Sequence, residues 1–335
     1  MSLFGDLDVR LEPWDVEFGS ETPLESPEEI PGETVVLDIE LSENEWRAIR
    51  PAPTELPRRL VFVDGVRRVE ARLIVRRNET LCRGAFGSYA VGCTVIAGGR
   101  AEIGTTRVHR LAVLGSGESF STSVEVMPAL VYQPESTESD EVDGPLQLIQ
   151  QRMRIGEERL AREMADEAET FVVVDGPLTF GEKVQGEAVG YVKRLHRLYL
   201  DGGPKPEKKM NLLYELPKGM RTPLFALRSS QRFARYCWFL RLSEPHRGES
   251  PLSGLVRLEV SEAVGVDTAR RLADATSAAL PRFAPARGRD PRAPQNLLPI
   301  GALESRLRRQ LGDARLIRRH IGSLLGREAV HAKEA

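Results

Sequence analysis

The sequence predicts an α/β protein in which a mixed β-sheet is flanked by helices. Apolar residues in the first half form short runs and alternations typical of strands, a long amphipathic stretch follows, and strand and helix patterns then alternate. The clearest run is FVVVDGPLTF at residues 171–180, where four β-prone apolar residues lead into an Asp-Gly pair at Asp175. LVFVDGVRRVEARL at residues 60–73 repeats the arrangement with an Asp-Gly pair at Asp64.

Length and composition indicate a soluble globular protein. At 335 residues the chain can bury a sizeable core in one large domain or two small ones. No apolar run approaches the roughly 18 residues of a membrane span, and the acidic N-terminus does not resemble a signal peptide. We therefore expect a cytoplasmic protein without a membrane partner. Cys82, Cys93 and Cys237 are too few and too scattered for a disulfide framework or a zinc cluster.

Charge is distributed unevenly although the net charge is only −2. Residues 1–45 are acidic, whereas residues 282–327 are rich in arginine. This polarity suits a protein that meets nucleic acid with one face and a protein partner with another. A solvated helix face of mixed charge explains it equally well.

The N-terminal half is expected to hold an extension and an antiparallel meander. Residues 1–57 form an acidic extension with one strand at 34–41, either packed on the domain or serving as a partner-binding arm. The alternation in residues 58–114 predicts strands at 60–64, 69–75, 88–97 and 105–114. Residues 133–145 are acidic and poor in apolar residues, which predicts a loop or a disordered linker.

The C-terminal half is expected to alternate helices and strands. A long amphipathic helix is predicted over 146–168, a strand ends at Asp175, and helical spacing predicts a helix over 187–201. The remaining elements are strands at 235–242 and 254–260 and helices at 267–280, 297–311 and 314–325. A hairpin-rich start followed by helix–strand alternation gives a mixed sheet, and a ribonuclease H-like fold is laid out this way.

Two strand-end aspartates and a helix glutamate are the parts that a carboxylate metal site needs. Asp-Gly is also the commonest hairpin turn, so either pair alone is more simply a turn. Two such pairs, each ending an apolar strand with acidic residues between them, favour a site. Hard divalent cations prefer oxygen ligands, and two of them about 4 Å apart can stabilise the attacking and leaving oxygens of phosphodiester cleavage.

Three glutamates of the predicted helix over 146–168 are candidates for the third acid. At 100° per residue, Glu157 projects beside the apolar stripe, whereas Glu158 points to nearly the opposite side. Glu167 is near the stripe but in the last turn, where it can reach water. An unpaired buried carboxylate is costly, so an inward acid needs a partner. Glu157 is therefore preferred, with Glu158 and Glu167 left open.

Other chemistries have weaker support. Glu70 is a possible fourth acid, but a cross-strand pairing with Arg68 or Arg72 explains it more simply. There is no P-loop, no Gly-x-Ser-x-Gly elbow and no zinc spacing among the histidines. An actin-like sugar-kinase-type ATPase would want Ser or Thr after each Asp-Gly pair, where this chain has Val66 and Pro177.

Several segments, in this order, resemble the NurA nucleases, which partner HerA-type hexameric ATPases in processing DNA ends. They are FVDG at 62–65, MRIGEERLA at 153–161, VVVDGPL at 172–178, GYVKRLH at 190–196, WFLRL at 238–242, VRLEV at 256–260 and PQNLLPIGALE at 294–304. The resemblance covers residues 58–325, which would be the nuclease domain. Residues 1–57 would then be its N-terminal extension and 326–335 its C-terminal tail.

The resemblance implies a ribonuclease H-like homodimer that cuts DNA with manganese, or with magnesium in its place. Its activity would be that of a 5′-end exonuclease, with single-strand endonuclease action as an option, in end resection and double-strand break repair. Asp64, a helix glutamate and Asp175 would be the metal ligands, and Lys193 would contact the scissile phosphate. The acidic N-terminus would dock the ATPase or organise the dimer.

The sequence differs from the NurA pattern at one position, and this difference leaves a non-catalytic role as an alternative. Archaeal members carry an Ala-His pair in the final proline–leucine motif, where this chain reads Ile300-Gly301. The missing histidine leaves the number of metal ions and the level of activity open. It slightly favours a non-catalytic ribonuclease H-like scaffold that regulates a DNA-translocating ATPase.

Overall fold

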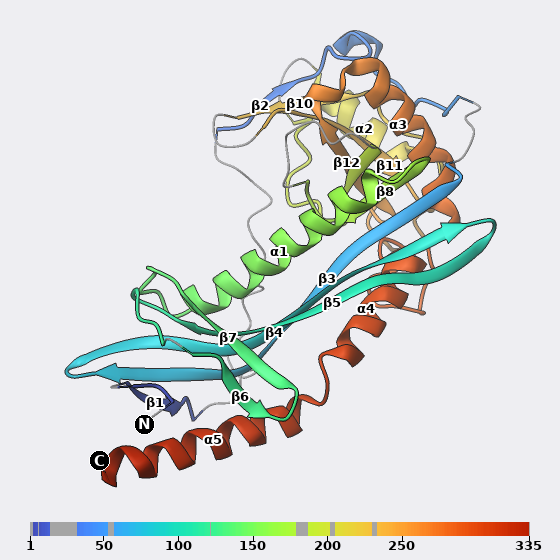
Figure 1. The fold of residues 1–335 in the computed structure, drawn as a ribbon. Helices are drawn as coiled ribbons and strands as arrows, with labels where there is room; N and C mark the ends of the chain where they lie inside the picture. Colours follow the sequence, from blue (N-terminus) through green and yellow to red (C-terminus); the bar gives the residue numbers. More distant parts are fainter. Residues whose placement is uncertain are drawn as a thin grey trace.

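Three long antiparallel strands, a helix and two parallel strands form the centre of the molecule. β3 (Arg59–Arg77), β4 (Thr80–Ala97) and β5 (Arg100–Leu114) are antiparallel neighbours. After α1 (Gly144–Ala165), β8 (Thr170–Asp175) lies parallel to β3, and β9 (Glu187–Val192) lies parallel to β8. The resulting order β5-β4-β3-β8-β9 is a ribonuclease H-like mixed sheet, as the sequence predicts (Figure 1).

The fold is seen in a computed structural model, which describes residues 3–5, 7–13, 32–52, 57–120, 122–178, 187–201, 205–229 and 233–334, without the side chains of 331–334. Further strands extend the sheet to twelve: β1 (Asp8–Leu11), β2 (Thr34–Val36), β6 (Val124–Met127), β7 (Leu130–Ser136), β10 (Phe225–Arg228), β11 (Arg235–Arg241) and β12 (Leu255–Ser261). The other helices are α2 (Pro206–Glu215), α3 (Val266–Ala279), α4 (Leu298–Gln310) and α5 (Ala314–Glu334), with short 3-10 turns at Glu43–Glu45, Glu262–Val264 and Leu280–Arg282.

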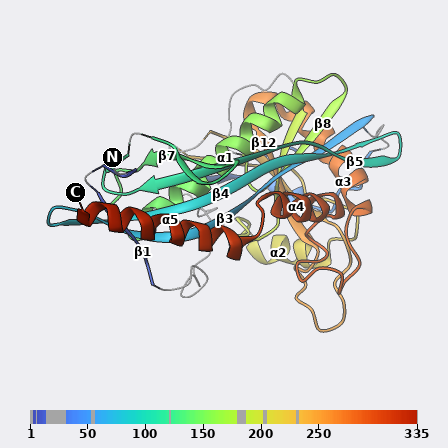
Figure 2. The same cartoon turned by 60° about the horizontal axis from the view of Figure 1, so that its bottom comes forward.

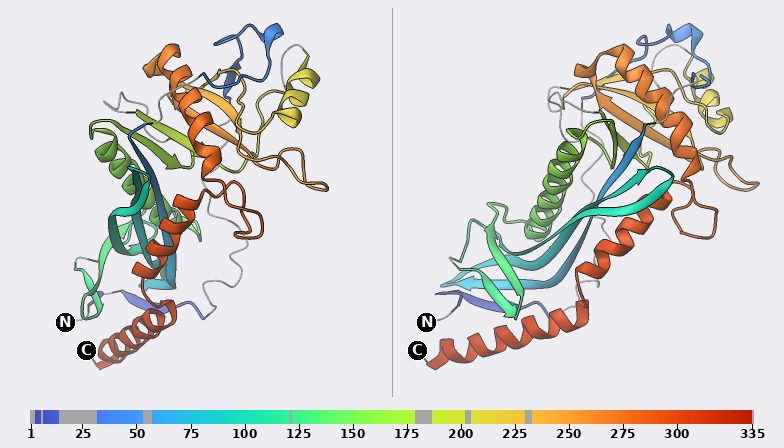
Figure 3. Two further views of the ribbon diagram at one scale, coloured as in Figure 1. Left: turned by 90° about the vertical axis from the view of Figure 1, so that its right-hand side faces the viewer. Right: turned by 45° about the vertical axis from the view of Figure 1, so that its right-hand side comes forward.

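Helices cover both faces of the central strands. Val61 and Val63 of β3 pack with Leu160 of α1, whereas Val66 packs with Leu303 of α4. Figure 3 shows the long strands between α1 on one side and the C-terminal helices on the other. Because neighbouring side chains of a strand point to opposite faces, each position of β3 is assigned to one of these two layers.

The long β3–β4 hairpin reaches past the centre and has a second core at its far end. β1 pairs with β3 there, and α5 lies along the same end (Figure 2). Both chain termini lie at this end of the molecule (Figure 1). α5 continues to Glu334, so the tail expected at 326–335 is helical up to that residue. None of the described helices combines the length and apolar composition needed to cross a membrane.

The Asp-Gly pair at Asp64 is not a turn, contrary to the prediction of two strands at 60–64 and 69–75. β3 runs unbroken through it, with Asp64 opposite Gly92 and Gly65 opposite Val91. The close approach of α1 explains the glycine. A Cβ on Gly65 would lie 2.5 Å from Glu157 Oε1 and 2.9 Å from Met153 Cγ.

The helix predicted over 187–201 is wrong: residues 187–192 form β9, and residues 193–201 are not helical. β9 lies between β8 and β12 and is buried on both faces, with Val189 and Tyr191 in one core cluster and Ala188 in another. A strand buried on both faces lacks a clean alternation and cannot be told from a buried helix by periodicity. β9 ends at Val192 and delivers Lys193 beside the end of β8.

The described part of the N-terminal extension belongs to the sheet. β2 pairs with β10, and the carboxylate of Glu40 accepts hydrogen bonds from both terminal nitrogens of Arg221 and from the Leu224 N–H. Trp46 is buried. The most acidic stretch, residues 14–31, lies outside the described residues. The linker expected at 133–145 is strand as far as Ser136, and the sequence did not predict α2, β6 or β10.

Candidate metal centre

The register of two parallel strands places Asp64 beside Asp175. Phe62 pairs with Val173 and Val63 with Val174, so the two aspartates occupy the next level. Phe62 and Val173 share one core cluster, and the alternation turns the side chains two residues further on to the same face. The sequence prediction that the two strand-end acids meet is consistent with this geometry.

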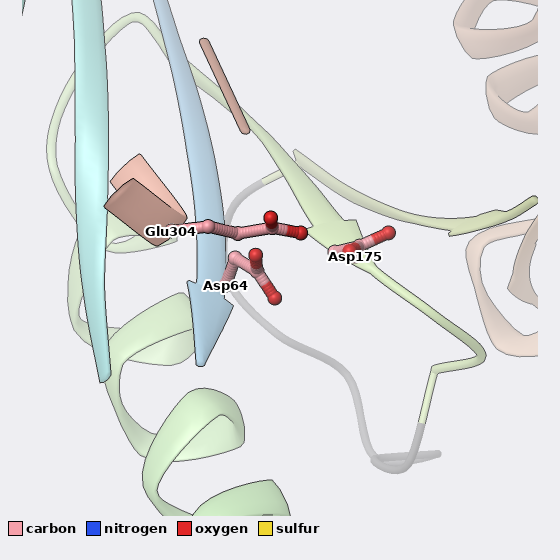
Figure 4. Close-up of side chains that lie close together, drawn as sticks. All are labelled: Asp64, Asp175 and Glu304. Atoms are coloured by element: carbon pink, nitrogen blue, oxygen red, sulfur yellow. The ribbon is translucent and has the colours of Figure 1, made fainter. Parts of the chain in front are cut away.

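The third acid of the cluster is Glu304 of α4. One carboxylate oxygen from each of Asp64, Asp175 and Glu304 lies within 4.8 Å of the others (Figure 4). All three residues are buried, with 5%, 8% and 4% of their surfaces exposed. α4 lies over this face because Ile300, Leu303 and Leu307 are buried against the sheet.

Glu157 approaches the centre from the opposite face. It lies on α1 beneath Gly65, and the absence of a side chain there makes room for its carboxylate. Its Oε2 accepts a hydrogen bond from Arg154 at 3.1 Å. The predicted helix acid is therefore turned inward, as expected, but it is not one of the three acids that meet.

Two oxygens of the cluster lack protein partners. Asp64 Oδ1 accepts the Gly65 N–H at 2.8 Å, and Asp175 Oδ2 accepts Lys193 Nζ at 2.5 Å. Among the described residues, Asp64 Oδ2 and Asp175 Oδ1 are buried without a hydrogen-bond partner. A buried carboxylate oxygen without a partner is costly, so these atoms call for a bound cation or water.

Basic and amide side chains around the cluster form hydrogen bonds with its carboxylates and with one another. Lys193 Nζ also donates to Asn296 Oδ1 at 3.0 Å, and Asn296 Nδ2 donates to Asp290 Oδ2 at 3.0 Å. Arg292 donates to both oxygens of Glu304, at 2.7 and 2.6 Å. The segment before α4 thus fixes both Lys193 and Glu304 in orientation.

Burial and mutual repulsion disfavour the charged state of the cluster. Burial raises the pKa of Asp64 well above its ordinary value, and the Asp175 carboxylate raises it further, against the opposing effect of Lys193. Burial also raises the pKa of Glu157, and Arg154 opposes this rise. Burial would lower the pKa of Lys193, but Asp175 and Asp64 outweigh it and the pKa is raised. A divalent cation would reverse this balance for the acids.

The donor set fits a hard divalent cation. Its atoms are carboxylate oxygens, which Mg²⁺ and Mn²⁺ prefer, and it offers no thiolate or imidazole of the kind that zinc sites use. The three oxygens lie within 4.8 Å of one another, whereas ligands of an octahedral Mg²⁺ site are about 3 Å apart when adjacent and about 4 Å apart when opposite.

No protein-family model matches the chain, and no curated protein matches it in sequence. The crystal structure of the NurA nuclease from Sulfolobus solfataricus is similar at 12% identity over 86% of this chain and 91% of that chain, with a TM-score of 0.48. The catalytic domain of human endonuclease V is similar at 15% identity over 76% and 82%, with a TM-score of 0.29. The chemistry is therefore argued from the residues of the site.

The other candidate acids lie elsewhere. Glu158 pairs with Arg162 at 2.8 Å, and Glu167 pairs with Arg59. Glu70 is buried, and its Oε1 lies 3.4 Å from Nη2 of Arg68, one of the two predicted partners, although both residues belong to β3 and the pair is not cross-strand.

The sequence analysis missed Glu304 as a site residue, although its signal was present. Glu304 lies within the apolar stripe of Ile300, Leu303 and Leu307, which is the pattern that singled out Glu157. At Gly301, where the resemblance leads one to expect a histidine, a Cβ would lie 3.3 Å from Asn296 Nδ2.

Proposed function

We propose that this protein is a metal-dependent deoxyribonuclease that hydrolyses phosphodiester bonds. The observation that carries the proposal is the buried cluster of Asp64, Asp175 and Glu304, with two carboxylate oxygens lacking partners. A divalent cation bound there would supply Lewis acidity at a phosphoryl oxygen and lower the pKa of a bound water. Glu157, expected from the sequence as a ligand, stays a candidate at the edge of the cluster.

The surrounding residues have roles that fit a phosphodiester substrate. Lys193, which donates to Asp175 and Asn296, would bind a phosphate oxygen and orient the scissile group. α4 and the start of α5 expose several arginines, of which Arg308 pairs with Glu304 of the cluster; they are Arg306, Arg308, Arg309, Arg315 and Arg319. Such arginines bind nucleic-acid backbones without regard to sequence, which suits an enzyme that processes DNA ends.

The finer assignment follows the resemblance to the NurA nucleases. In this proposal the enzyme is a cytoplasmic homodimer that uses Mn²⁺, or Mg²⁺ in its place, and acts on single- and double-stranded DNA ends. It degrades 5′ ends in resection and double-strand break repair together with a HerA-type hexameric ATPase. The rival, a non-catalytic scaffold, accounts for the fold but gives no reason for three buried carboxylates in one place.

Digestion of end-labelled DNA tests the proposal. The wild type, Asp64→Asn and Asp175→Asn would be incubated with single- and double-stranded substrates in Mn²⁺, Mg²⁺ or chelator. Glu158→Gln is the matched control, since it neutralises an acid of α1 whose carboxylate pairs at the surface. We expect metal-dependent loss of label with the wild type and the control, and at least a roughly hundredfold loss in both Asp variants.

Two results would contradict the proposal. Cleavage that persists unchanged in both Asp variants would show that the cluster is not the site. No cleavage by the wild type with either metal, alone or with a HerA-type ATPase added, would favour the scaffold.

A further inference from the structure

Arg154 forms an ion pair with Glu157 on the α1 side of the sheet. It precedes Glu157 by three residues on α1, and one guanidinium nitrogen donates both to Glu157 Oε2 at 3.1 Å and to the Asp175 carbonyl at 3.2 Å. Gly176 leaves room for it, because a Cβ there would lie 2.8 Å from the same nitrogen. About a quarter of the Arg154 side chain is exposed, against 3% for Glu157.

The two faces of the sheet separate Glu157 from the other acids. Asp64, Asp175 and Glu304 meet on the α4 side, whereas Glu157 reaches the centre beneath Gly65 from the α1 side. A second ion about 4 Å from the first would have to use Glu157, since two-metal sites share carboxylates between neighbouring ions. The guanidinium of Arg154 pairs with that carboxylate through Oε2, while Oε1 is buried without a hydrogen-bond partner among the described residues.

The charge balance agrees with a single ion. Four carboxylates of the centre face three cations, which leaves one net negative charge; these groups are Asp64, Glu157, Asp175, Glu304, Arg154, Lys193 and Arg292. Asp290, which pairs with Arg292, and Arg308, which pairs with Glu304, carry opposite charges and leave the net charge unchanged. One divalent ion would leave one positive charge, whereas two would leave three, and an uncompensated buried charge is costly.

We propose that the centre binds one divalent cation through Asp64, Asp175 and Glu304, and that the guanidinium of Arg154 takes the place of a second ion by neutralising Glu157. The inference rests on the proposed function and specifies its metal requirement. Glu157 is then a charge partner of Arg154, and metal dependence follows the filling of a single site.

Counting bound Mn²⁺ per chain, by equilibrium dialysis with electron paramagnetic resonance of the free ion, tests this directly. We expect one Mn²⁺ in the wild type, one in Arg154→Lys and two in Arg154→Met, where Glu157 is released. Arg162→Met is the matched control. It removes an arginine two turns further along the same helix that pairs with Glu158, and this variant should still bind one Mn²⁺. Two ions in the wild type, or one in Arg154→Met, would overturn the inference.

A second pair of variants keeps the test decisive if Arg154→Met does not fold. Glu157→Gln should bind one Mn²⁺ with an affinity within about threefold of the wild type, whereas Glu304→Gln should lose at least about tenfold. An equal loss in both variants would make Glu157 a ligand and refute the inference. A wild type that binds no Mn²⁺ would instead refute the metal-dependent function itself.

Discussion

Replacing Asp64 by asparagine should stabilise the metal-free protein while it removes metal binding. The substitution keeps the shape of the side chain and the hydrogen bond from Gly65, but it removes one charge from a cluster whose oxygens lie within 4.8 Å. At an effective dielectric constant of about 20, two unit charges about 5 Å apart repel by roughly 3 kcal/mol. Lys193 offsets part of this repulsion, so we expect a net gain of about 1–2 kcal/mol.

Thermal unfolding with and without metal measures the effect. In chelator, Asp64→Asn should melt about 1–3 °C above the wild type. With Mn²⁺ at about 100 times its dissociation constant, the wild type should gain about 2.7 kcal/mol and the variant almost nothing, so the order reverses. Asp267→Asn is the control, because the Asp267 side chain is 98% exposed, and it should stay within about 0.5 kcal/mol of the wild type.

The pH dependence of this difference has a definite sign. The folded pKa of Asp64 is raised by burial and by Asp175, so the native state holds its proton to a higher pH than the unfolded chain does. The wild type therefore loses stability as pH rises from the unfolded pKa of about 3.9 through the raised folded value. The advantage of Asp64→Asn should be small near pH 4 and larger at pH 8. A variant that is less stable than the wild type in chelator at pH 8 would refute the reasoning.

Three further predictions follow from the structure. Gly65→Ala should lower the free energy of unfolding, measured by urea denaturation, by about 1–3 kcal/mol, because the added Cβ would lie 2.5 Å from a Glu157 oxygen. The control Gly326→Ala, which adds a Cβ in open space on α5, should be neutral or stabilising. Burial raises the pKa of Glu70 to about 7, so the wild type should lose about 3 kcal/mol relative to Glu70→Gln between pH 4.5 and 8, and parallel stability curves would contradict this. Arg221→Met should cost about 3–5 kcal/mol and expose the N-terminal segment to proteases, since it removes the buried cation shared by Glu40 and Asp274 and leaves Glu40 paired with the more exposed Arg270. Unchanged proteolysis would show that the segment is held by other contacts.

Much of the fold was predictable because its signals are local. The alternation in β3, the apolar run of β8 and the amphipathic stripe of α1 are each set by neighbouring residues, and the element order then gives the mixed sheet. The same local reasoning failed for β9, where burial on both faces hides the period of a strand. It also predicted that a strand ends at Asp64, where β3 continues.

The sequence by itself determined which two aspartates follow the apolar runs of the central strands, and that a glutamate of α1 turns inward. Only the tertiary structure decided that α4 covers the face of the sheet to which Asp64 and Asp175 point, so that Glu304 joins them and Glu157 is left with Arg154 on the other side. The reason is physical. The side on which a residue points depends on its own strand, but the helix that covers that side depends on packing between segments more than a hundred residues apart.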